Sequence, residues 1–376
     1  MTDRVTDLGA VNRDFEKYDQ VRKAHTYRLA EQEGDEFDED YRIATLDFGR
    51  FLHGSAADRE RFAEEFAGAL KEIGFAVLTG HGVDPALYDA MHDSVIELFT
   101  GTPLEEKMRF RAARHGSVAQ GYFPLEETSE IHPDLVEGWV WCRRAFDIPQ
   151  RRDGPFRAED FWPRAEQERR FRRLVEAHEP LFKPIAQAMF QGLGLDPHVY
   201  DPRLTQTNFG LRANYYPPMT GEQAGSGAGR LFGHEDVDLF TILPASKVDG
   251  LQVWNHRSGK WVRMLAPCGS IIINTGDYMQ RITNDVLPST THRVGKPTDG
   301  SHLSAARVSF PMAVYVWEDE LLEVLPGLGE PKYEPVKAIA FHTRSTSKFY
   351  GDDYAVESAC GSSTGVQRFR KPSSCT

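Results

Sequence analysis

Residues 251–265 read LQVWNHRSGKWVRML, two short apolar runs on either side of a polar turn. Both runs, Leu251 to Trp254 and Trp261 to Leu265, contain β-branched and aromatic side chains that favour strands. Between them, Arg257-Ser258-Gly259 has the composition of a hairpin turn. The stretch therefore predicts two antiparallel strands joined by a short turn.

Further β-rich runs surround this hairpin. After Leu195 the apolar residues recur with a period close to two, which is the period of a half-buried strand. Strands are predicted at 211–216, 239–243, 270–274 and 307–317. Many short strands separated by Gly- and Pro-rich turns favour a β-sandwich or a jelly roll over a doubly wound sheet.

The first half of the chain has helical periodicity instead. Helices are predicted at 58–73, 85–99 and 166–191, and a short strand at 74–78. We therefore expect four regions: a polar N-terminal extension (1–40), a helical region with strands that contribute to the core (41–195), a β-sandwich or jelly-roll core (196–350) and a loose C-terminal tail (351–376).

Charge and composition argue against several classes of protein. The formal net charge is -12 and no long basic run occurs, which argues against a nucleic-acid partner. No stretch approaches the roughly 18 apolar residues of a membrane span. The first residues lack the apolar core of a signal peptide, and the four cysteines are scattered. Free thiols of this kind predict a cytoplasmic location.

The chemistry is concentrated at His234-Glu235-Asp236, at the entrance to the predicted strand 239–243. In an extended segment, residues two apart point to one face, so His234 and Asp236 can converge while Glu235 points away. One imidazole and one carboxylate are two ligands of the 2-His-1-carboxylate triad, which leaves iron open positions for other ligands. Alone, His-x-Asp is a weak signal.

Downstream residues strengthen the signal. His292 follows Gly276-Asp277, and Arg307 and Ser309 open the last predicted strand two residues apart, so that they share one face. A guanidinium fork beside a hydroxyl suits a carboxylate on an otherwise apolar wall. The remaining histidines of interest are interpreted as structural (His81) or as surface residues (His256, His302 and His342).

In their order and spacing these residues resemble one family, the isopenicillin N synthase-like branch of the 2-oxoglutarate/Fe(II) dioxygenases. Linking pieces match in the same order, namely 74–75, 81–83, 214–218 (NYYPP), 250–253 (GLQV) and 269–277 (GSIIINTGD). The resemblance covers roughly residues 41–350. It implies a mainly β fold with flanking helices, a distorted double-stranded β-helix, or jelly roll, buttressed by helices.

The resemblance also implies six site residues: His234, Asp236 and His292 as ligands of Fe(II), Arg307 and Ser309 at the distal carboxylate of 2-oxoglutarate, and Tyr216 near that cosubstrate. The implied activity consumes O2 and 2-oxoglutarate, releases succinate and CO2, and oxidises a small organic molecule. Related halogenases leave room for chloride where this chain has a carboxylate. Hydroxylation, desaturation or ring formation is therefore implied.

Three alternatives stay open at this point. An oxidase resembling isopenicillin N synthase would hold its substrate's own carboxylate with Arg307 and Ser309 and would consume no 2-oxoglutarate. An ethylene-forming enzyme of the family would fragment 2-oxoglutarate or a cyclic amino acid. A non-catalytic jelly-roll binding protein would have lost a triad residue, and none is lost here. The nominated substrate region is Gln120 to Phe123 with Arg212, and residues 222–230 are either a lid or a plain connection.

Overall fold

A computed structural model describes residues 36–115, 118–125, 135–151, 156–219, 230–297, 300–342 and 345, and the backbone of 14–15, 27–28 and 367–368. Most of the predicted N-terminal extension and C-terminal tail lie outside these ranges. So do residues 222–229 of the segment predicted as a lid or a connection.

The described strands form one large sheet, one small sheet and two short ladders. The large sheet runs in the order β19 (Gln367–Arg368), β5 (Ala113–His115), β6 (Val118–Phe123), β7 (Glu137–Cys142), β8 (Phe209–Tyr216), β16 (Met312–Val314), β10 (Phe240–Pro244), β13 (Ile271–Thr275), β4 (Phe75–Thr79) and β3 (Thr45–Asp47), and β15 (Arg307–Ser309) also pairs with β8. The small sheet runs β12 (Lys260–Arg263), β11 (Leu251–Asn255), β14 (His292–Val294) and β9 (Leu231–His234). The ladders are β1 (Asp14–Phe15) with β2 (Tyr27–Arg28), and β17 (Leu321–Leu322) with β18 (Val336–Lys337).

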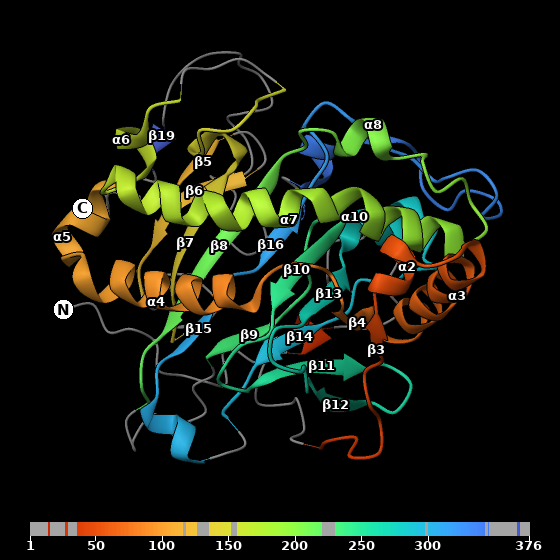
Figure 1. The fold of residues 1–376 in the computed structure, drawn as a ribbon, viewed down its shortest axis with the longest axis horizontal. Helices are drawn as coiled ribbons and strands as arrows, with labels where there is room; N and C mark the ends of the chain where they lie inside the picture. Colours follow the sequence, from red (N-terminus) through yellow and green to blue (C-terminus); the bar gives the residue numbers. More distant parts are fainter. Residues whose placement is uncertain are drawn as a thin grey trace.

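The two main sheets pack face to face and confirm the predicted jelly roll. Val253 and Val262 of the small sheet share one buried cluster with Val77 and Ile272 of the large sheet. Figure 1 shows β9, β14, β11 and β12 in the lower half of the molecule, next to β10 and β13. Within the described part of the chain the strands form open sheets and do not close into a barrel.

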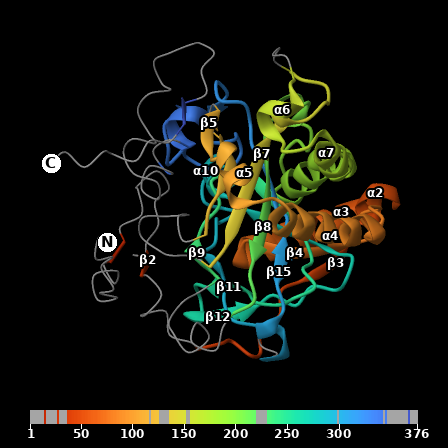
Figure 2. The same ribbon diagram turned by 90° about the vertical axis from the view of Figure 1, so that its left-hand side faces the viewer.

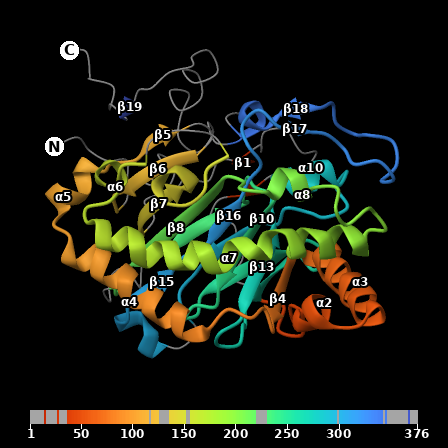
Figure 3. The ribbon, with the colours of Figure 1, turned by 45° about the horizontal axis from the view of Figure 1, so that its top comes forward.

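Helices cover the large sheet. They are α2 (Gly49–His53), α3 (Ala56–Ile73), α4 (Pro85–Gly101), α5 (Leu104–Arg109), α6 (Ala158–Phe161), α7 (Ala165–Gly192), α8 (Asp201–Leu204) and α10 (Asp277–Ile282), with 3-10 turns η1 (Arg143–Ala145) and η2 (Gly300–Ser304). In Figure 2, α3, α4 and α7 lie together on one side of the large sheet, and Figure 3 shows α7 running along it. None of the helices in the described ranges combines the length and the apolar character that crossing a membrane requires.

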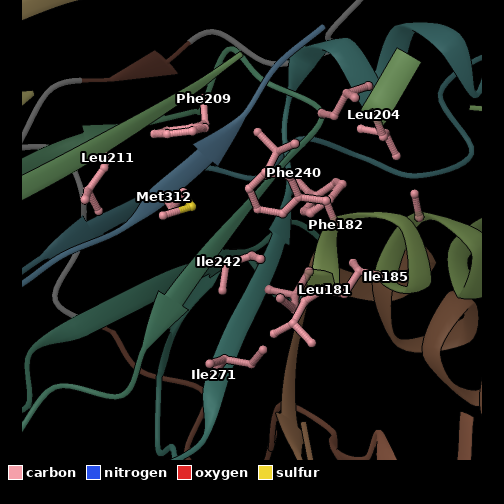
Figure 4. Packing of buried hydrophobic residues seen from close by; sticks show 14 of the residues in the cluster. Leu181, Phe182, Ile185, Leu204, Phe209, Leu211, Phe240, Ile242, Ile271 and Met312 are labelled. Carbon is pink, nitrogen blue, oxygen red and sulfur yellow. The ribbon is translucent and has the colours of Figure 1, made fainter. Parts of the chain in front are cut away.

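The apolar stripe of α7 forms the contact between helices and sheet. Leu181, Phe182 and Ile185 point from α7 towards Phe240 and Ile242 of β10 (Figure 4), and all five side chains are buried in the main core. Because residues three and four apart share one helical face, the period seen in the sequence selects this contact surface. Helix α7 therefore packs against one face of β10, the strand that follows His234-Glu235-Asp236.

The end of α3 is tied to the segment that leads into β14. Gly74 ends the helix with a φ of 72°, and its amide donates to the carbonyl of Leu70. A Cβ at this position would lie 2.6 Å from Thr290 Oγ1 and 2.7 Å from the carbonyl oxygen of Pro288. Only glycine combines this backbone conformation with so close an approach.

One predicted strand is wrong in extent. The run 307–317 forms two strands, β15 and β16, which both pair with β8. Pro311 lies between them and has no amide proton to donate, so the ladder is interrupted there. The break matters because it isolates Arg307 to Ser309 as a separate short strand opposite Asn214 to Tyr216.

Candidate active site

Two histidines face each other across the small sheet. His234 is the last residue of β9, His292 is the first of β14, and the antiparallel ladder makes them direct partners. Their ring centroids lie 4.3 Å apart. The pairing register therefore brings together two imidazoles that are far apart in the sequence.

Asp236 completes a cluster of three ligand atoms. Its Oδ1 lies 3.7 Å from Nε2 of His234 and 3.9 Å from Nε2 of His292. The ligand atoms of the three residues all lie within 4.8 Å of one another, so the group could hold a metal ion. As expected for the residue between His234 and Asp236 in an extended segment, Glu235 points elsewhere and accepts a hydrogen bond from Thr291.

The second carboxylate oxygen of Asp236 is held by the protein. Asn274 Nδ2 and Thr241 Oγ1 donate to Oδ2 over 2.9 Å and 2.7 Å. Burial raises the pKa of Asp236, but His292, His234 and these hydrogen bonds lower it by a larger amount. The resulting pKa lies below the ordinary value. The carboxylate is thus kept ionised, with Oδ1 directed at the histidines and available to a metal.

A backbone carbonyl fixes the tautomer of His292. Nδ1 of its ring lies 3.1 Å from the carbonyl oxygen of Thr290. With the proton on Nδ1, donated to that carbonyl, Nε2 carries the lone pair and faces Asp236. Phe75 packs edge-on against the ring, with centroids 5.3 Å apart. The donor set and its supports therefore fit a transition-metal ion such as Fe(II).

Asp238 forms a buried layer behind Asp236. Thr241 Oγ1 lies 2.7 Å from Oδ2 of each of these two carboxyl groups, although a hydroxyl has only one proton to donate. Burial raises the pKa of Asp238 well above its ordinary value, and the charge of Asp236 adds to the rise. We therefore assign a proton to Asp238, which donates to Thr241, which in turn donates to Asp236.

We expect the Asp238→Asn variant to change how stability depends on pH. Because the folded-state pKa of Asp238 is raised, its proton stabilises the fold fully below the ordinary value of 3.8, and this contribution is lost as pH rises towards the folded pKa. An asparagine amide can replace the carboxyl proton in donating to Thr241 without titrating. The free energy of unfolding of the variant, relative to that of the wild type, should therefore increase from pH 5 to pH 8. Urea titration of the metal-free proteins measures this difference.

A variant that removes an exposed carboxylate controls for net charge. Asp160 lies on α6, has a half-exposed side chain and makes one long ion pair with Arg157. The Asp160→Asn protein should follow the wild-type profile. Parallel pH profiles for the Asp238→Asn and wild-type proteins would show that Asp238 carries no extra proton in the folded state.

The residues predicted to bind a carboxylate form a second cluster. In the β8–β15 ladder Arg307 is the partner of Tyr216, and Ser309 is the partner of Asn214. Arg307 is 2% exposed, its Nε donates to the carbonyl of Val248, and its guanidinium carbon lies 5.0 Å from the Tyr216 ring centroid. Nη1 of Arg307 is buried and has no hydrogen-bond partner among the described residues.

An apolar cluster connects the two groups of polar residues. Tyr216 packs with Val294 of β14 and Leu231 of β9, the strands that carry His292 and His234. The shared neighbour places the Arg307 cluster on the same side of the jelly roll as the His-Asp-His cluster.

The nominated substrate region is partly assembled next to these clusters. The Arg212 guanidinium carbon lies 5.8 Å from the ring centroid of Phe123. Arg212 Nε donates to Asn214 Oδ1 over 2.6 Å, and Asn214 Nδ2 donates to Ser309 Oγ over 3.3 Å. Gly138 leaves the room that Arg212 occupies, since a Cβ there would lie 3.2 Å from Nη2.

Sequence reasoning missed several supporting residues and misjudged one histidine. Thr241, Asn274 and Asn214 were detectable only as polar residues within predicted apolar strands. His342, interpreted as a surface residue, is instead 5% exposed and lies 3.1 Å from the Tyr278 hydroxyl. Its polar sequence neighbours concealed this burial. His81 is structural as predicted, with Nε2 2.8 Å from the carbonyl oxygen of Gly269.

Comparisons with known proteins agree with this arrangement. The N-terminal model of the non-haem dioxygenase in morphine synthesis matches residues 43–165, and the model of the 2OG-Fe(II) oxygenase superfamily matches residues 207–313. The 2-oxoglutarate-Fe(II) type oxidoreductase ppzD of Metarhizium rileyi is 26% identical over 83% of this chain and 92% of that protein. Isopenicillin N synthase of Streptomyces griseus is 26% identical over 75% of this chain and 86% of that protein.

A solved structure of the same family is similar to this chain. A protein of Caulobacter crescentus, described as a member of the 2OG-Fe(II) oxygenase family, has a TM-score of 0.69 and 29% identity, and the match covers 81% of this chain and 98% of that chain. The jelly roll, its covering helices and the His-Asp-His cluster are the features of a non-haem iron oxygenase. The chain belongs to the 2OG-Fe(II) oxygenase superfamily. It is an oxidoreductase that requires Fe(II), 2-oxoglutarate and O2 and acts on a small molecule.

Proposed function

We propose that His234, Asp236 and His292 hold the Fe(II) with which this enzyme couples decarboxylation of 2-oxoglutarate to hydroxylation, desaturation or cyclisation of a small organic substrate. The observation that carries the proposal is the convergence of Nε2, Oδ1 and Nε2 of these residues within 4.8 Å. Three ligands on one side of a metal leave the other positions for cosubstrate and oxygen.

Arg307, Ser309 and Tyr216 take the distal carboxylate of 2-oxoglutarate in this proposal. A buried N–H without a partner costs stability, so the Nη1 of Arg307 is best explained by an acceptor that arrives with a ligand. Ser309 Oγ already accepts from Asn214, which leaves its own proton to donate. A guanidinium and a hydroxyl together suit a carboxylate.

The two clusters are connected through β14. Val294, which packs with Tyr216, lies two residues beyond His292 along β14. Two residues of a strand span about 6.7 Å. Tyr216, the ladder partner of Arg307, thus packs against β14 close to His292, as expected if one dicarboxylate contacts both clusters.

When bound, Fe(II) together with 2-oxoglutarate and O2 supplies the oxidant that removes hydrogen from the substrate. The residues of the chain bind and orient these groups. His292 presents a lone pair at Nε2, Asp236 stays ionised and turned towards the histidines, and Arg307 neutralises the distal carboxylate. Burial of Arg307 excludes water from that end, which strengthens its attraction for an anion.

We place the substrate beside Arg212 and Phe123. Arg212 is hydrogen-bonded through Asn214 to Ser309, so the substrate region and the cosubstrate cluster share one polar chain. A guanidinium next to an aromatic ring favours a substrate with an anionic or carbonyl group and an apolar body. Small organic acids are therefore the first compounds to screen.

The test of the proposed reaction is its stoichiometry. With a true substrate, we expect one succinate and one CO2 for each product molecule, because the oxidation of the substrate consumes one O2 and one 2-oxoglutarate. Anaerobic loading with Fe(II), followed by O2 with and without 2-oxoglutarate, allows succinate and product to be measured together. Omitting 2-oxoglutarate should abolish product formation.

The same assay distinguishes the proposed 2-oxoglutarate-dependent reaction from that of an oxidase that consumes no 2-oxoglutarate. Deleting residues from Ala359 onward, which include β19 (Gln367–Arg368), should leave iron binding and the product-to-succinate ratio unchanged. Gln367 pairs through its backbone with Arg114 at the edge of the large sheet. Full turnover without added or copurified 2-oxoglutarate, lost when this tail is removed, would support an oxidase that takes a ligand from the tail.

Location and further partners are proposed from charge and cysteine use. Cys142 and Cys268 are free thiols in the structure, which agrees with a reducing, cytoplasmic compartment. The net charge of -12 disfavours a nucleic-acid partner.

A further inference from the structure

A second arginine lies next to Arg307 without a counter-ion contact in the described residues. Arg230 immediately precedes β9 and is 1% exposed. Its Nη2 donates to the carbonyl oxygen of Ala305 over 3.2 Å, two residues before Arg307 in the chain. Its Nε and Nη1 are buried, and no hydrogen-bond partner for either occurs within the described ranges.

Another fully buried arginine shows how a structural guanidinium is satisfied in this fold. Arg143, also 1% exposed, pairs with Glu179 Oε1 at 2.6 Å and donates to the carbonyl oxygens of Thr207 and Pro149. Arg230 has one carbonyl contact instead. An unsatisfied buried charge of this kind is costly and needs a specific reason.

The burial of Arg230 and the positive charge near it favour the binding of an anion. Burial lowers the pKa of Arg230, and the positive charge of Arg307 lowers it further, whereas the attraction of Asp249 is a smaller effect. Asp249 is also shared with His302, whose Nδ1 lies 3.5 Å away. Two neighbouring guanidinium groups repel each other, and a carboxylate between them would satisfy both.

We propose that Arg230 is a second arginine of the cosubstrate site and donates, together with Arg307, to the distal carboxylate of 2-oxoglutarate. This inference rests on the proposed function, because it assumes the ligand of Arg307. A carboxylate has two oxygens with about four acceptor positions, enough for Arg307 Nη1, the Ser309 hydroxyl and an N–H of Arg230. Arg230 thus makes the site selective for a dicarboxylic 2-oxoacid.

The experiment compares two ligands on the Fe(II)-loaded protein without oxygen. 2-Oxopentanoate has the carboxylate and keto groups of 2-oxoglutarate and the same number of carbons, but it lacks the distal carboxylate. Calorimetric titration of the Arg230→Ala variant should show an affinity for 2-oxoglutarate at least about tenfold lower than that of the wild type. Its affinity for 2-oxopentanoate should stay at the wild-type level. Arg230→Lys should fall between, because lysine keeps the charge without the planar fork.

Two further variants make the outcome decisive. Arg257→Ala removes the same charge from the exposed turn between β11 and β12, where the Arg257 side chain is 70% exposed, and it should change neither affinity. If Arg230→Ala folds poorly, the Arg230→Gln variant gives the same comparison, since only the ratio of the two affinities is read.

Three results would contradict the inference. Equal losses for both ligands in the Arg230 variants would make Arg230 a structural residue. Unchanged 2-oxoglutarate affinity in Arg230→Ala, with a loss in Arg307→Ala, would overturn the role of Arg230 and leave the proposed function intact. Unchanged affinity in both variants would also remove the proposed cosubstrate site.

Discussion

Replacing His234, Asp236 or His292 with alanine should abolish iron binding and turnover while the fold persists. Each variant removes one of the three atoms that converge in the cluster, and two ligands hold a metal far more weakly than three. The loss should exceed the about 10- to 100-fold effect of removing a residue that only supports a ligand. Iron content after anaerobic loading and succinate formation are the two measurements.

The fold should tolerate these changes because the site lies at the edge of the core. The side chains of His234 and Asp236 are 29% and 22% exposed, and the circular dichroism spectra of their variants should match that of the wild type. His256→Ala, in the exposed turn after β11, is the matched control and should retain iron. Stoichiometric iron with full turnover in two of the three cluster variants would refute the assignment.

Replacing Arg307 with alanine should have the second largest effect. It removes the charged partner of a desolvated carboxylate, which should cost about 2–5 kcal/mol of 2-oxoglutarate binding. Arg307→Lys should recover only part of this loss, because lysine lacks the bidentate fork and the stacking on Tyr216. Titration of the Fe(II)-loaded, oxygen-free protein with 2-oxoglutarate measures both affinities.

Arg143→Lys provides a control at a buried arginine with its own partners. Arg143 is held by Glu179, so the change should lower stability and leave the affinity for 2-oxoglutarate unaltered. If Arg307→Ala binds 2-oxoglutarate as tightly as the wild type does, the cosubstrate assignment is wrong. An oxidase that holds its own substrate at Arg307 would then be the better description.

Local periodicity was sufficient to predict most of the helices and strands. The hairpin predicted around Arg257-Ser258-Gly259 is formed by β11 and β12, with Trp254 paired to Trp261. The helix predicted at 58–73 is α3, which begins with a capping box between Ser55 and Asp58. These features depend on side-chain alternation and backbone propensity over short distances, so the sequence alone contains them.

The separation of β15 from β16 was not predicted, although Pro311 is visible in the sequence. Both strands add to the same neighbour, β8, and the apolar character continues across the break. A proline between two apolar runs is compatible with an edge strand as well as with two strands. Both strands keep one continuous register against β8, so only the interruption at Phe310 and Pro311 divides them.

For the candidate site, the sequence alone showed which kinds of side chain are present and how His234, Glu235 and Asp236 are oriented relative to one another. The alternation of an extended chain was enough to place His234 and Asp236 on one face and Glu235 on the other, as the structure shows. Adding His292 required the resemblance to a family, because nothing local relates it to His234. The β9–β14 register supplies that relation by making the two residues direct partners.

Only the tertiary structure decided the burial and the partners of the charged groups. Arg230 and Arg143 are both arginines beside apolar residues in the sequence, yet Arg143 meets Glu179, while Arg230 lies near Arg307. Asp238 has no distinguishing sequence feature, but its burial, together with the charge of Asp236, raises its pKa well above the ordinary value. Burial and partners depend on strands that are distant in sequence and meet only in the folded sheets, because charge interactions act through space and not along the chain.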